Sequence, residues 1–77
     1  MNWQQKVTDA DEVKVFNALD KPVYTWRTVG GIARQTGLSE ARVAQILAKY
    51  DLELTRMSGT PSVSGSALVG LIEKVGV

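Results

Sequence analysis

The chain contains no cysteine and no histidine among its 77 residues. Without them there is no disulfide framework and no thiolate or imidazole ligand for a metal ion. The usual nucleophile–base pairs of covalent catalysis are excluded for the same reason. The acidic residues are scattered without a pairing that indicates catalysis. We therefore expect a protein that is not an enzyme and that carries neither a cofactor nor a metal.

Long apolar runs are also missing. No stretch reaches the roughly 20 apolar residues of a membrane-spanning helix, and residues 1–6 lack the apolar core of a signal peptide. We therefore expect a cytoplasmic protein with no membrane partner. A length of 77 residues and a hydrophobic fraction of 44% fit one folded domain with a modest core. Because no repeat or linker is visible, we expect a single domain over residues 1–77.

The net charge is only +1, but the charges are unevenly distributed. Residues 1–20 hold two lysines against four acidic residues, a balance of −2. Residues 21–50 hold five basic residues against Glu40 alone, a balance of +4. A local patch of this kind attracts phosphate even on a nearly neutral domain. The alternative is an ordinary solvated surface.

The stretch 32–47 organises the rest of the chain, because it predicts two short helices joined by a tight turn. Ala33 is small enough for a second helix to cross closely. Gly37 stands where the first helix must end in a left-handed residue. Leu38 can fill the space under the turn, and Ser39 can cap the next helix through its hydroxyl.

The second helix of this stretch has apolar residues at helical spacing, which predicts a buried stripe of Val43, Ile46, Leu47 and Tyr50. A small residue, a turn glycine, a cap and two apolar residues three apart are the helix-turn-helix arrangement. Residues 28–50 thus resemble the helix-turn-helix of bacterial DNA-binding proteins.

Flanking patterns extend the resemblance. Asp9 and Glu12 have capping-box spacing ahead of an apolar face, and Pro22 ends that helix. The predicted elements are helices at 9–20, 28–36 and 39–50, and strands at 23–26, 52–56 and 67–72. Strand 52–56 should pair antiparallel with 67–71 across the turn-rich loop 58–66. Residues 9–72 thereby resemble a winged helix-turn-helix, an α+β fold of three helices and a small antiparallel sheet (the wing).

Two features leave several interpretations open. Trp3 and Val7 can fold back onto the body, pair as a strand or project, and a packing anchor is favoured over a partner-binding hook. Gly30 and Gly31 indicate either tight packing against Trp26, or a frayed first turn, or else bare amides that approach a phosphate. Residues 73–77 are expected to be a short tail.

A third helix that buries its apolar stripe must turn Ala41, Gln45 and Ala48 outward, with basic side chains on one flank and Ala44 on the other. In a major groove Gln45 would read a base edge, with adenine as its best match, while Arg42 and Lys49 would contact phosphates. Arg34 and Arg27 would extend that basic line. The loop 58–66 lacks Lys and Arg, so its hydroxyls and Arg56 at its base would have to meet phosphate. The predicted DNA-binding residues are Arg34, Ser39, Ala41, Arg42, Ala44, Gln45, Ala48, Lys49, Arg56, Thr60 and Ser62.

The resemblance implies binding of double-stranded DNA and a role in bacterial transcriptional regulation. The alternative is a winged-helix protein-interaction module, because a smooth, nearly uncharged helix face also suits protein docking. A homodimer or another protein partner is open in either case.

Overall fold

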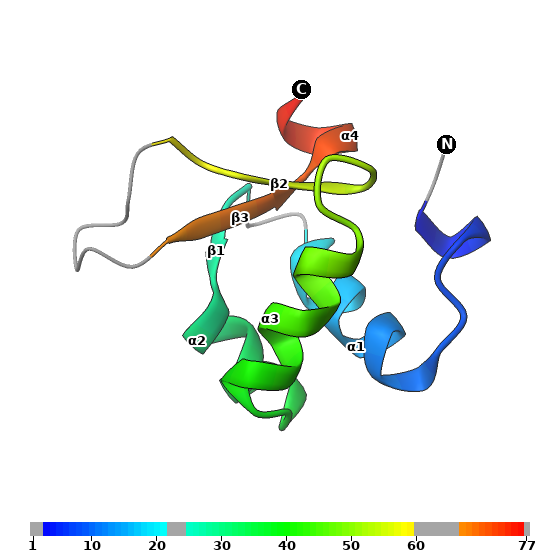
Figure 1. Cartoon of the computed structure of the whole chain (residues 1–77), viewed down its shortest axis with the longest axis vertical. Helices are drawn as coiled ribbons and strands as arrows, with labels where there is room; N and C mark the ends of the chain where they lie inside the picture. The colour runs from blue at the N-terminus through cyan, green and yellow to red at the C-terminus, as the bar shows by residue number, and fades with distance from the viewer. Residues whose placement is uncertain (1–2, 22–24, 60–66, 77) are drawn as a thin grey trace.

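The computed structural model describes residues 3–21, 25–59 and 67–76, and these form an α+β fold. In chain order the elements are η1 (Trp3–Gln5), α1 (Ala10–Leu19), β1 (Arg27–Thr28), α2 (Val29–Thr36), α3 (Glu40–Lys49), β2 (Thr55–Met57), β3 (Leu68–Leu71) and α4 (Ile72–Val75). Helices α1 to α3 cluster at one end of the molecule, and the sheet with α4 lies at the other (Figure 1). Within the described ranges no helix has the length and apolar character needed to cross a membrane.

The three longer helices begin at the predicted capping residues. The Asp9 carboxylate accepts the N–H groups two and three residues ahead, at 3.1 and 3.2 Å. The Thr28 and Ser39 hydroxyls each accept the N–H three residues ahead, at 3.0 and 3.1 Å. The predicted ranges 9–20, 28–36 and 39–50 are therefore confirmed to within their capping residues.

The turn between α2 and α3 is built on a left-handed glycine, as predicted. Gly37 has a φ of 79°, and its N–H donates to the Ala33 carbonyl at 2.9 Å. Leu38 follows and packs against the core. Because α3 starts three residues after this glycine, the turn fixes the angle at which α3 leaves α2.

The chain after α3 does not extend at once, so the strand predicted at 52–56 is wrong for its first three residues. The Tyr50 carbonyl accepts the N–H groups of the three residues 53–55, at 3.0 to 3.3 Å. These bonds satisfy the end of α3 by curling the chain, and Leu52 adopts a φ of 62° with 72% of its surface exposed. Strand β2 consequently begins at Thr55.

The sheet has the order β1-β3-β2 with antiparallel pairing throughout. Thr55 faces Leu71 and Met57 faces Val69, so the predicted antiparallel pairing is confirmed. The strand predicted at 23–26 lies later, at β1; residues 22–24 are outside the described ranges, as are residues 60–66 of the predicted loop.

The end of the chain folds into a fourth helix where a strand end and a tail were predicted. Ile72 still donates its N–H to the Leu54 carbonyl at 2.9 Å, but it then opens α4. Lys74 on α4 donates to the Lys21 carbonyl at 2.8 Å and lies 3.5 Å from the Asp20 carboxylate. These contacts hold α4 against the end of α1, so residues 73–76 are part of the packed structure.

The core lies between the helices and the sheet and includes the N-terminal segment. Trp3 is 3% exposed, its ring lies 5.5 Å from the Phe16 ring, and its indole N–H donates to Asp20 at 3.0 Å. The packing interpretation of Trp3 is confirmed, because a buried ring offers no surface to a partner. Helix α1 contributes Val15, Phe16, Ala18 and Leu19 to the core, whereas Val13 is only partly covered.

Gly37→Ala should lower the free energy of unfolding by roughly 1–2 kcal/mol, the cost of a left-handed L-residue. An added Cβ at Gly37 would meet no atom within 4 Å, so backbone conformation is the whole cause. Gly59→Ala is the matched control, because Gly59 is equally open and its φ is not positive. Urea unfolding followed by circular dichroism would measure both, and equal destabilisation would contradict the prediction.

Candidate nucleic-acid interface

Helix α3 buries one face and exposes the other, in the predicted phase. The stripe of Val43, Ile46, Leu47 and Tyr50 is buried. The predicted outward residues Ala41, Ala44, Gln45 and Ala48 are all exposed. We call these four the α3 strip. Three of its four side chains are methyl groups, it bears no charge, and Gln45 is its single hydrogen-bonding side chain.

Arg42 flanks the α3 strip but is turned toward the start of α1. Its guanidinium lies 3.6 Å from the Asp9 carboxylate and 3.5 Å from that of Asp11. Both pairs are partly exposed to solvent, so each contributes little stability. Their effect is electrostatic, since the two carboxylates neutralise a cation that sequence reasoning assigned to DNA phosphate.

Lys49, the other flanking cation, is held by a buried carboxylate. Its Nζ lies 2.8 Å from Glu12 Oε2, and the Tyr50 hydroxyl donates to Glu12 Oε1 at 2.6 Å. Glu12 has capping-box spacing, but its carboxylate turns to α3. The Lys49 side chain is still 60% exposed, so its ammonium meets both Glu12 and water.

These contacts shift three pKa values. The hydrogen bond from Lys49, followed by that from Tyr50, lowers the pKa of Glu12, although burial acts in the opposite direction. The hydrogen bond to Glu12 is also the largest cause that raises the pKa of Lys49 and the pKa of Tyr50. Glu12 is therefore ionised and Lys49 protonated at neutral pH.

Two further predicted cations, Arg34 and Arg27, differ in the contacts that their guanidinium groups make. Arg34 is exposed and forms no ion pair with any residue in the described ranges. Its guanidinium and the Glu40 carboxylate each lie 3.9 Å from where a Cβ on Gly30 would stand. Arg27 instead reaches away from α3, donating to the Ala18 carbonyl at 3.1 Å and to the Gln35 side chain.

The glycine pair at the start of α2 is explained in part by packing. A Cβ on Gly31 would lie 3.1 Å from the Thr28 hydroxyl and 3.2 Å from the Arg27 guanidinium. The space at Gly31 is thus filled by Thr28 and Arg27, where Trp26 was expected. A Cβ on Gly30 would meet nothing closer than 3.9 Å, so packing does not require glycine there.

The remaining predicted contact residues either bond to other parts of the protein or lie outside the described ranges. Arg56 donates to the Gly76 carbonyl at 3.4 Å and lies over the Trp26 ring, 5.9 Å from its centroid. The Ser39 hydroxyl is occupied as the α3 cap. Thr60 and Ser62 belong to residues 60–66, which the structure does not describe.

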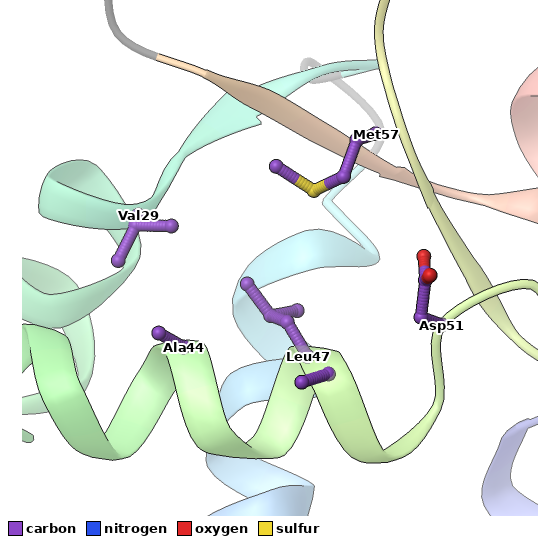
Figure 2. Close-up of a pocket in the computed structure, with 6 residues that line it drawn as sticks. Val29, Ala44, Leu47, Asp51 and Met57 are labelled. Carbon is purple, nitrogen blue, oxygen red and sulfur yellow. The ribbon is translucent and has the colours of Figure 1, made fainter.

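An apolar groove borders the α3 strip, which sequence reasoning missed. It has a volume of about 230 Å³, and its lining includes Val29, Leu47 and Met57 together with Ala44 and Ala48 of the strip. Figure 2 shows Val29, Leu47 and Met57 pointing toward one space, with Asp51 at its end. Met57 is 41% exposed. The alternation of buried and exposed residues along β2 could have predicted the exposure of Met57 only if the strand had been predicted to begin at Thr55.

Comparison of the chain with models of protein families, with curated proteins and with solved structures gave no match.

Glu12→Gln should lower the free energy of unfolding at pH 7 by about 1–3 kcal/mol, because it weakens a buried charged network. The pKa of Glu12 is lowered on folding, so its contribution is present above the unfolded value of about 4.3 and is lost as pH falls through the folded value. The variant should therefore lose less stability than the wild type between pH 7 and pH 3. Denaturant unfolding at the two pH values would measure this.

Asp11→Asn is the control for that comparison. Asp11 forms a partly exposed ion pair, so its loss should cost no more than about 1 kcal/mol at pH 7. The contribution of Glu12 to the acid-induced loss should remain in this variant. If Glu12→Gln loses as much stability between pH 7 and pH 3 as the wild type does, folding does not lower the pKa of Glu12.

Proposed function

We propose that the chain is a winged helix-turn-helix domain that binds double-stranded DNA through the exposed face of α3. The element order α1, β1, α2, α3, β2, β3, with β2 antiparallel to β3, supports this fold. One observation carries the function: the α3 strip is exposed directly after the left-handed turn, and it is free of charge and of bulky side chains. A helix with such a face can approach base edges closely in a major groove.

The proposed roles follow from what each side chain already contacts. Gln45 is the reading residue, since its carboxamide can form two hydrogen bonds to adenine. Arg34 is the first phosphate contact, because its guanidinium is exposed and unpaired among the described residues. Arg42 and Lys49 must share their charge with the α1 carboxylates and contribute less. The cellular role that fits is regulation of transcription.

The apolar groove favours a second candidate, a protein-docking module. The groove adjoins the α3 strip and ends at Asp51, whose carboxylate would repel phosphate. The ion pairs of Arg42 and Lys49 further reduce the positive field on this flank. An apolar partner segment that carries a cation would complement these features.

A titration with a random duplex at two salt concentrations, followed by NMR shifts, separates the two candidates. DNA binding predicts salt-sensitive shifts on α3 and at Arg34, because phosphate contacts release counterions. A complete absence of shifts at low salt would reject DNA binding and leave the docking module.

Three variants then test the assigned roles. Arg34→Gln should weaken binding to all duplexes and reduce the magnitude of the salt slope by about one unit, whereas Arg42→Gln, with the same loss of charge, should change the slope less. Gln45→Ala should leave the slope unchanged and cost roughly 1–3 kcal/mol only on a duplex selected as the preferred site. Equal slopes for the two arginine variants would show that Arg42 leaves Asp9 and Asp11 to bind DNA.

A further inference from the structure

The acidic and the basic residues of α1 and its caps differ in their partners. The carboxylates are all held by other parts of the protein: Asp9 and Asp11 by Arg42, Glu12 by Lys49 and Tyr50, and Asp20 by Trp3 and Lys74. None of these partners belongs to α1. The acidic residues therefore form their ion pairs with other segments and not with the lysines of the same segment.

Those lysines, Lys14 and Lys21, have no such partner among the described residues, although Asp11 stands three residues before Lys14 on the same side of α1. Lys14, Asn17, Ala18 and Lys21 follow the spacing of one helix face, with Lys21 just past the helix end. The main chain at Lys21 is fixed by the 2.8 Å hydrogen bond from Lys74 to its carbonyl. Neither lysine side chain forms an ion pair within residues 3–21, 25–59 and 67–76.

The two lysines line a groove between α1 and the last turn of α2, away from the α3 strip. Its volume is about 310 Å³, and Asn17, Ala18, Gln35 and Thr36 complete the lining that the structure describes. This lining contains no carboxylate. Arg27 adds a third positive charge beside it, because its guanidinium bonds both the Ala18 carbonyl and the Gln35 side chain.

The two carboxamide side chains of the groove can also act as donors. Arg27 donates to Gln35 Oε1, so the carboxamide oxygen of Gln35 is occupied and its NH₂ group remains to donate. The Asn17 carboxamide supplies a second NH₂ group from α1. Two ammonium groups and two amide donors without a competing carboxylate match the acceptor oxygens of an anion.

We propose that this groove binds a phosphate group. Lysine binds phosphate as a point charge, and the amide donors of Asn17 and Gln35 would complete the contacts to its oxygens. A volume of about 310 Å³ lies at the small end of ligand pockets, which suits one phosphate ester. The phosphate comes either from a free phosphate ester or from a DNA backbone, and the site does not depend on DNA binding by α3.

Titration of ¹⁵N-labelled protein with inorganic phosphate tests the site directly, because the side-chain NH₂ signals of Asn17 and Gln35 report from inside the groove. We expect saturable shifts of both signals that sodium chloride at equal ionic strength does not produce. Lys14→Gln and Lys21→Gln should each weaken binding by about threefold, as the loss of an exposed charge contact does. Both lysines are exposed, so the variants should fold, which the NMR spectrum checks.

Lys6→Gln is the matched control, since it removes one exposed positive charge from a residue that pairs with Glu53 and does not line the groove. Its affinity for phosphate should equal that of the wild type. Shifts that chloride reproduces, full affinity in the Lys14→Gln and Lys21→Gln variants, or equal weakening by Lys6→Gln would each overturn the proposal.

A duplex titration of the same signals identifies the source of the phosphate. Shifts of Asn17 and Gln35 that Lys14→Gln reduces would indicate the DNA backbone. Their absence, with saturable shifts from inorganic phosphate, would indicate a free phosphate ester. A protein that binds phosphate here but no duplex would reject the proposed function while keeping this site.

Discussion

The buried carboxylate of Glu12 is the constraint on which the arrangement of the helices depends. An ionised group that is only 5% exposed must be paired, because an uncompensated buried charge costs several kcal/mol. Tyr50 and Lys49 at the end of α3 provide the pairing, at 2.6 and 2.8 Å. The same contact sets the Tyr50 ring edge-on to Phe16, with centroids 5.2 Å apart. One polar network thus fixes how α3 crosses α1, and thereby which face of α3 points to solvent.

Pairing with α1 also decides which cations remain for a partner. A count along the chain assigns +4 to residues 21–50, yet two of those cations, Arg42 and Lys49, face α1 carboxylates and a third, Arg27, bonds Ala18 and Gln35. Arg34 on α2 and Lys21 after α1 are the ones that form no ion pair among the described residues. The acid-rich start of α1 and the basic α3 were visible in the sequence, but only their contact shows that they neutralise each other.

The sequence predicts those parts of the fold that local chemistry determines. The caps at Asp9, Thr28 and Ser39, the turn at Gly37 and the phase of α3 each depend on residues within about one turn. The strand ends depend on contacts beyond the strands themselves. The Tyr50 carbonyl accepts hydrogen bonds from the N–H groups of residues 53–55, and α4 forms where Lys74 contacts the end of α1. The need for glycine at position 70 also depends on a distant contact, because a Cβ there would lie 2.8 Å from the Thr25 carbonyl oxygen. The α3 strip was therefore predictable, whereas the pairing of its flanks and both grooves were not.

The two proposed surfaces can act separately because electrostatic fields in salt are short. The Debye length at physiological ionic strength is about 8 Å, well below the smallest dimension of the molecule, 22 Å. An approaching anion therefore responds to the groups nearest to it, and the net charge of +1 has little influence. Near the start of α1 it meets carboxylates already paired with Arg42, whereas beside Lys14 and Lys21 it meets cations without a counter-ion among the described residues. The groove beside Lys14 and Lys21 therefore remains positive, because the α1 carboxylates pair with Arg42, Lys49 and Lys74 and none of them lines it.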